Sequence, residues 1–343
     1  MMLRRLGIVA ALAAALVVLT AGPVLADPVA PTNYRSVVNT VDPLPTGVTI
    51  SVLGGDGYLA MVVTDGHTAE VPGYFGEPYL RFDGDGSVWR NALSPARFIN
   101  RDRYGTTGVP DSADAAAEPR WEQVASGGSF AWHDHRTHWM STDLPPTIGG
   151  DRAEIVFPWF VDIVVDGVET EVRGELLWFP SVNPIGPLLS GGIAVLLFLA
   201  WRRGRLSPLP HIAAGAGALV LFVAITQFAA TPGSDRGLPI GAVAPAIAIL
   251  LAVGALWIGR VDLPTRTLVL VSGLALIWWA FDTRDALTAP VLPSALPTFV
   301  ERASVALALW LGAGLVVLTI LELLPRRTVD GEPTDADRVH ADA

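Results

Sequence analysis

The chain falls into four stretches that differ in their pattern of hydrophobic and polar positions. Residues 1–26 are mostly apolar, and residues 27–183 alternate short β-branched and aromatic runs with Gly, Asp and Pro. Residues 184–324 are hydrophobic in long blocks, and residues 325–343 are polar and acidic. This order predicts a signal peptide, an extracytoplasmic β domain, a transmembrane helical domain and a disordered cytoplasmic tail.

The N-terminal stretch has the layout of a secretory signal. Arg4 and Arg5 precede the apolar run 6–20, and residues 24–26 place small side chains where a signal peptidase reads them. We expect a signal peptide that is removed after Ala26. An uncleaved anchor stays open, because the apolar run can be stretched toward the roughly 18 residues that span a bilayer. In both cases the next segment is exported.

The exported segment has the pattern of antiparallel strands joined by tight turns. Runs of β-branched and aromatic residues flank Gly- and Asp-rich turns, which is the signal of a β-hairpin. Three hairpins are expected, pairing 48–53 with 58–63, 79–82 with 87–90, and 155–165 with 169–179. Many short strands without a helical period predict an all-β, antiparallel, Ig-like sandwich. Residues 94–120, rich in Pro, Asp, Ala and Gly, are expected to form a long loop.

The hydrophobic blocks predict a bundle of about five transmembrane helices. The expected spans are 185–201, 211–230, 238–259, 267–281 and 303–324. Arginines cluster after the first, third and fifth blocks, at Arg202, Arg203, Arg205, Arg260, Arg266, Arg326 and Arg327. Because arginine-rich ends stay in the cytoplasm, we expect a multi-pass protein of the plasma membrane. Its N-terminal domain is extracytoplasmic and its C-terminus cytoplasmic.

The helical half offers few groups for ion or proton transport. His211, Asp282 and Glu322 lie at the ends of the expected spans, and Gln227 lies deeper. Ionisable side chains at bilayer depth mark most transport pathways, because an unpaired charge there is costly. The helices are therefore expected to anchor or dock, with glycines such as Gly217 permitting close packing.

The amino-acid composition excludes several classes of partner and cofactor site. The 343 residues are 51% hydrophobic with a net charge of −10, so nucleic acid is not an expected partner. There is no cysteine, which excludes disulfides, thiolate zinc sites and iron–sulfur clusters. The expected partners are membrane lipid and another envelope protein or wall component.

The stretch 131–140, reading AWHDHRTHWM, is the densest in side chains that carry chemistry. On an extended strand His133 and His135 share one face about 7 Å apart along the chain, as two ligands of one metal require. His138 lies on the opposite face unless a bulge or turn follows Arg136. No cofactor is certain, but imidazoles with carboxylate or thioether suit copper or zinc.

The metal hypothesis names His133, His135 and His138, with His67, Asp134 and Met140 as candidates for a further ligand. Two other interpretations stay open. The histidines can pack and donate hydrogen bonds, with Asp134 and Arg136 forming an ion pair. They can also sense pH, because imidazole titrates near neutrality. No nucleophile-elbow motif is present, so the protein is expected to be non-enzymatic.

Three groups of residues in the exported segment carry a resemblance. They are Gly73-Tyr74-Phe75-Gly76-Glu77-Pro78-Tyr79-Leu80-Arg81, then Ser94-Pro95-Ala96 with Asn100-Arg101, then Trp132-His133-Asp134-His135-Arg136 with His138-Trp139-Met140. The pattern resembles a family of exported, membrane-anchored proteins of high-GC Gram-positive bacteria. The resemblance covers most of the exported domain and implies an envelope location and a shared outer domain, but no activity. Exported copper-handling proteins of similar layout begin with histidine after cleavage, whereas Asp27 is expected here.

Two functions follow as hypotheses. The first is a membrane-anchored, extracytoplasmic binding or assembly module of the cell envelope. The alternative is an extracytoplasmic protein that handles copper or zinc through the region of His133 and His135.

Overall fold

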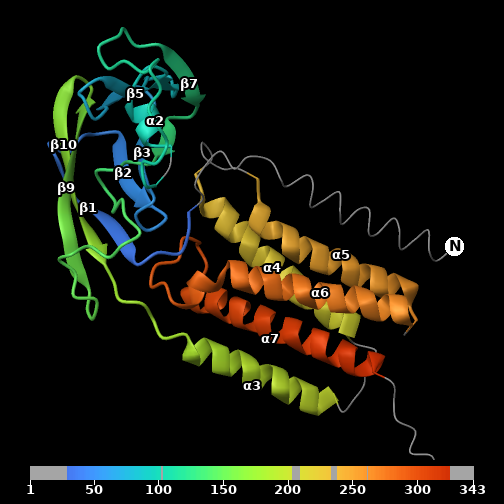
Figure 1. The fold of residues 1–343 in the computed structure, drawn as a ribbon. Coiled ribbons are helices and arrows are strands. Elements are labelled where there is room, and N and C mark those ends of the chain that lie inside the picture. The colour runs from blue at the N-terminus through green and yellow to red at the C-terminus, as the bar shows by residue number, and fades with distance from the viewer. Residues whose placement is uncertain (1–28, 102, 203–208, 233–237, 261, 325–343) are drawn as a thin grey trace, which may run out of the picture.

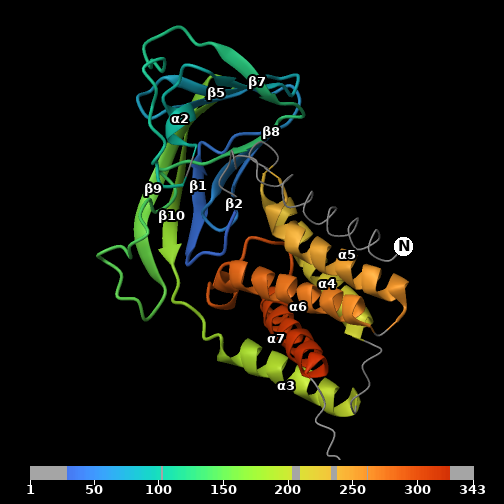
Figure 2. The ribbon, with the colours of Figure 1, turned by 45° about the vertical axis from the view of Figure 1, so that its right-hand side comes forward.

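The computed structural model describes residues 29–324 except 102, 203–208, 233–237 and 261. The signal peptide expected at 1–26 and the tail expected at 325–343 therefore lie outside the described residues. An antiparallel β domain stands at one end of a bundle of apolar helices (Figures 1 and 2). The two-part architecture expected from the sequence is confirmed.

The β domain consists of two antiparallel sheets. Its strands are β1 (Tyr34–Asp42), β2 (Val48–Leu53), β3 (Tyr58–Val63), β4 (Ala69–Pro72), β5 (Pro78–Phe82), β6 (Val88–Asn91), β7 (Trp121–Ala125), β8 (Ser129–Trp132), β9 (Glu154–Val165) and β10 (Val168–Trp178). One sheet has the order β1-β10-β9-β4-β5-β6-β7 and the other β2-β3-β8. Seven and three strands differ from the distribution in immunoglobulin domains, so the Ig-like detail is not confirmed.

All three expected hairpins form. β2 pairs with β3, β5 with β6, and β9 with β10, each antiparallel and within two residues of its expected ends. Residues 94–120 contain only the short helix α2 (Ala96–Ile99) and no strand among their described residues. Buried side chains from both sheets, such as Leu80 and Val172 from the larger and Phe130 from the smaller, share one core.

The helical half contains five helices among the described residues. They are α3 (Ile185–Arg202), α4 (Leu209–Ala230), α5 (Val243–Ile258), α6 (Leu263–Asp282) and α7 (Thr298–Leu323). Four are long and apolar enough to cross a membrane, namely α4, α5 with the preceding 3-10 turn η2 (Ile240–Ala242), α6 and α7. The described apolar part of α3, Ile185–Leu196, is shorter. A membrane location is supported, and four of the five expected spans are confirmed as candidates.

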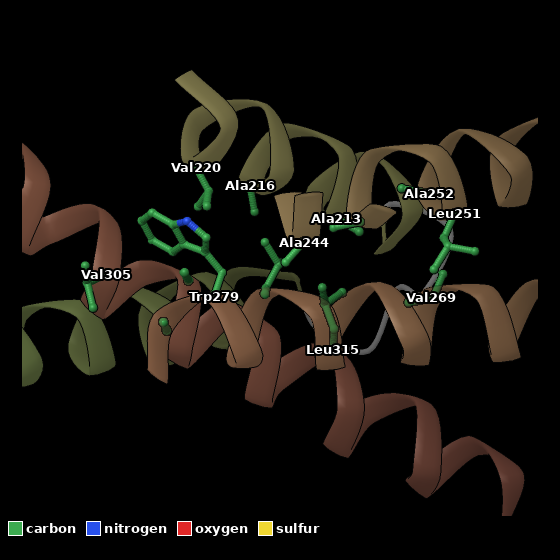
Figure 3. Packing of buried hydrophobic residues seen from close by; sticks show 14 of the residues in the cluster. Ala213, Ala216, Val220, Ala244, Leu251, Ala252, Val269, Trp279, Val305 and Leu315 are labelled. Atoms are coloured by element: carbon green, nitrogen blue, oxygen red, sulfur yellow. The ribbon is translucent and has the colours of Figure 1, made fainter. Parts of the chain in front are cut away.

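The core of the bundle is built mainly from small and branched side chains around one tryptophan. Trp279 of α6 is fully buried, belongs to the same cluster as Val220 of α4 and points toward it in Figure 3. α6 and α7 approach each other closely at Gly273 and Gly312, where a Cβ on Gly312 would lie 2.7 Å from the Gly273 carbonyl oxygen. Two glycines at the crossing therefore let the two helices pack backbone to backbone.

Backbone pairing joins the β domain to the bundle. Thr32, ahead of β1, and Val291, between α6 and α7, exchange two hydrogen bonds of 3.0 and 3.1 Å. Val182, after β10, donates to the carbonyl of Thr288 over 2.7 Å. Both chain segments that leave the domain are thus tied to the same interhelical loop.

Candidate functional site

The histidine-rich stretch begins as a strand and then turns back on itself. β8 ends at Trp132, and a turn follows in which the Thr137 amide and hydroxyl donate to the Asp134 carbonyl over 3.0 and 2.9 Å. The side-chain alternation expected for His133 and His135 therefore does not extend through the stretch. A turn was required for His138 to lie on the same side as the other two histidines, and the structure contains this turn.

The turn gathers all three imidazoles around His138. The ring centroids of His135 and His138 are 5.0 Å apart, and those of His133 and His138 are 6.5 Å apart, both in edge-on orientations. The Tyr58 ring lies 4.1 Å from that of His133, and Tyr74 packs on His135. All three histidines are buried, and His138 is only 1% exposed.

Asp134 holds the turn through an ion pair. Arg136 donates from Nε to Oδ1 over 2.8 Å and from Nη2 to Oδ2 over 2.7 Å, and the Trp132 indole donates to Oδ2 over 2.9 Å. Burial raises the pKa of Asp134, but the hydrogen bonds and charge of Arg136 outweigh it, so the pKa lies below its ordinary value. The expected ion pair is confirmed. Because both carboxylate oxygens are occupied, Asp134 is a poor metal ligand.

Burial also decides the protonation state of His138. Its pKa is lowered to about 3, first by burial, then by the charges of Arg103 and His135. The ring is neutral at physiological pH. His138 therefore cannot act as a sensor of pH near neutrality.

A second buried ion pair lies next to the histidines and was not expected from the sequence. Arg103, from the loop 94–120, donates from Nη1 to Oδ1 of Asp56 over 3.0 Å, and Asp56 is fully buried. Burial raises the pKa of Asp56, and the charge of Arg103 opposes that rise. Asp56 belongs to the Gly-rich turn before Tyr58, where an aspartate is normally exposed, so no local signal marked it.

A three-histidine metal site is not supported. Among the described residues, no group of three or more His, Asp or Glu side chains is placed to hold one metal ion. His67 lies beyond the end of β3 that is away from Tyr58, and the five strand steps of β3 alone span about 16 Å. Its Nδ1 lies 2.7 Å from Oδ2 of Asp166.

Met140, another of the proposed extra ligands, lies near His135. Its methyl carbon and Cε1 of His135 both lie 3.1 Å from the position that a Cβ on Gly105 would occupy. Gly105 has a φ of 62°, a left-handed conformation that favours glycine. Its lack of a side chain leaves room for both groups.

The helical half contains a buried carboxylate, Glu301, that precedes the expected last span 303–324. α7 begins at Thr298, so Glu301 lies within it and is fully buried. Gln227 of α4 donates to its Oε2 over 2.9 Å, and the Ser294 hydroxyl donates to Oε1. The pair gives a polar cross-link between α4 and α7 at the end near the β domain.

Comparison of the chain with protein-family models, curated proteins and solved structures finds no match.

Proposed function

We propose that the protein is a non-enzymatic, membrane-anchored module whose β domain binds another protein of the cell envelope. The proposal is carried by three exposed apolar side chains that belong to, or directly adjoin, chain segments in contact with the histidine cluster. Phe75, Tyr104 and Met140 are 69%, 40% and 41% exposed. Exposed apolar groups that gather on one surface of a protein commonly mark a binding site.

The backbone next to these three side chains is held in place by the buried histidine cluster. Phe75 follows Tyr74, whose hydroxyl accepts a hydrogen bond of 2.9 Å from the amide of His135. Tyr104 precedes Gly105, where a Cβ would lie 3.1 Å from both Cε1 of His135 and the methyl carbon of Met140. Because the buried cluster fixes these neighbours, the apolar groups lose little conformational entropy when a partner covers them.

Orientation supports the same proposal. Arg260 and Arg266 lie at the end of the bundle opposite the β domain, as the bounds of α5 and α6 require. The positive-inside rule then puts the β domain in the extracytoplasmic space, where it meets envelope partners.

A periplasm-active reporter inserted at Gly127 should be active and one fused after Leu324 inactive. A cytosolic position 127 would overturn the proposal.

Site-specific photo-crosslinking in intact cells tests the partner. A benzophenone side chain at Phe75 should give a discrete protein adduct. The matched control is Phe160, which is 60% exposed on β9 and should give none. An adduct that disappears after digestion of the wall would identify a wall component instead. Equal adducts at both positions, or none at Phe75, would refute the proposed surface.

Copper(I) binding by His135, His138 and Met140 is the second candidate. Nε2 of His138 is buried and has no hydrogen-bond partner in the described part of the chain. Neutral imidazole and thioether ligands suit a soft metal, and Met140 lies near His135, whose ring is 5.0 Å from that of His138. Titration of the detergent-solubilised chain with Cu(I), Cu(II) and Zn(II) tests this, with Met140→Leu as the variant. Binding that is absent, or unchanged in the variant, removes the candidate.

A further inference from the structure

A cavity of about 410 Å³ lies at the end of the bundle away from the β domain. It is formed by the first turns of α4 and α6 and by the last turns of α5 and α7. Leu209, Ala255, Leu256 and Val269 contribute an apolar wall. The cavity therefore offers a lipid-like surface at the depth where a helix bundle leaves the hydrocarbon core.

Polar groups line the remaining wall, and two of them lack partners. Thr319 is 1% exposed, and its Oγ1 has no hydrogen-bond partner among residues 29–324 as described. Oε1 of Glu322 is likewise buried without a partner in the described chain. A buried hydroxyl or carboxylate oxygen that makes no hydrogen bond costs stability. These two oxygens indicate a ligand with hydrogen-bond donors.

The charges of the cavity favour an anion. Arg266 donates from Nη1 to the Glu322 carbonyl over 2.9 Å, and its Nε lies 3.6 Å from Oε2 of the same residue. Arg260 also lines the cavity and is exposed. The arginine and glutamate side chains of the lining sum to one positive unit, His211 is a further lining side chain, and the first turn of α4 adds backbone N–H groups. This balance suits a singly charged phosphate diester.

We propose that the cavity binds a phospholipid whose headgroup carries one negative phosphate and free hydroxyls, as phosphatidylglycerol does. The phosphate contacts Arg260 and Arg266, and the headgroup hydroxyls donate to Glu322 and Thr319. An acyl chain lies along the apolar wall. Basic pockets between transmembrane helices recognise anionic headgroups in this way. The site is separate from the histidine cluster and independent of its function.

Native mass spectrometry of the full chain in detergent tests the proposal by titration with phosphatidylglycerol, phosphatidylethanolamine and phosphatidylcholine. Phosphatidylglycerol should bind most tightly. Arg260→Gln should weaken its binding about five-fold, the factor that corresponds to one basic residue near a lipid headgroup. Thr319→Val should weaken it as well, and Thr319→Ser, which keeps the hydroxyl, should restore it.

The matched control is Arg284→Gln at the other end of the bundle, where Arg284 is exposed. It should leave binding unchanged, and an effect equal to that of Arg260→Gln would mean unspecific attraction to surface charge. Equal binding of the three lipids would overturn the proposed headgroup. Full competition by millimolar inorganic phosphate would show a phosphate site in place of a lipid site. Thermal unfolding without lipid identifies any variant that is misfolded.

Discussion

Burial of His138 couples the stability of the β domain to pH. Its pKa is about 3 in the folded chain and about 6.5 in an unfolded one, so the unfolded chain binds more protons between these values. The contribution to the free energy of unfolding is fully present above pH 6.5. It is lost as the pH falls toward 3, by at most ~1.4 kcal/mol per pH unit.

His138→Gln should therefore flatten the pH dependence of the unfolding temperature between pH 6.5 and 4. His67→Gln is the control, because His67 is only part-buried and pairs with Asp166. Thermal unfolding of the solubilised chain across this range measures the effect. A slope as steep in His138→Gln as in the unchanged chain would contradict the prediction.

The ion pair of Asp134 and Arg136 is a second feature at the residue scale. Asp134→Asn removes one charge and leaves the largely buried guanidinium without its partner, which should cost about 3–5 kcal/mol of unfolding free energy. Glu154→Gln breaks the exposed pair with Arg152 and should cost less than about 1 kcal/mol. Denaturant unfolding of both variants gives the comparison. Similar losses would show that burial does not determine how much each ion pair contributes to the free energy of unfolding.

At the scale of elements, the crossing of α6 and α7 depends on the absence of side chains. A Cβ on Gly312 would meet the Gly273 carbonyl oxygen at 2.7 Å and Cγ1 of Ile277 at 2.8 Å, so Gly312→Ala should separate the helices. We expect a loss of about 1–3 kcal/mol, as for overpacking in a core.

Gly314→Ala is the control on the same helix, because a Cβ there lies 3.7 Å from Cγ1 of Val195, an ordinary contact. It should be neutral or slightly stabilising, since alanine favours the helix. Thermal unfolding in detergent distinguishes the two variants. If the Gly312→Ala variant were as stable as the Gly314→Ala variant, α6 and α7 could not pack as closely at Gly312 as described.

The sequence predicted the bounds of some of these elements correctly and those of others only approximately. It located the β2–β3 hairpin to the residue, because turn glycines and alternating side chains are local signals. It predicted the span 267–281, whereas helix α6 runs from Leu263 to Asp282 with Asp262 as its N-cap. It named Gly217 among packing glycines but not Gly273 and Gly312, because helix contacts depend on which faces meet.

At the scale of the whole molecule, the β domain is held against the bundle and is not merely tethered to it. Thr32 and Val291 form a hydrogen-bonded antiparallel pair, a geometry in which the Cα atoms lie about 5.5 Å apart. This distance suits a disulfide. Because the chain has no cysteine, an engineered pair has no competitor.

A double variant, Thr32→Cys with Val291→Cys, should therefore form an intramolecular disulfide in the exported protein. Non-reducing gel electrophoresis after cleavage of the chain between the two positions measures it. Each single variant is a control, because neither can form the bond. Free thiols in the double variant under oxidising conditions would contradict the rigid junction.

The sequence by itself determined the order of a β domain and an apolar helical region, the three hairpins and the approximate positions of the apolar helices. These features follow from periodicity, turn chemistry and the length of apolar runs, which neighbouring residues express directly. Only the tertiary structure decided that His138 joins His133 and His135, that Asp56 is buried against Arg103, and that Glu301 pairs with Gln227. Each of these contacts joins residues through a turn or across elements, so its energy depends on the packing of the whole chain and leaves no local pattern.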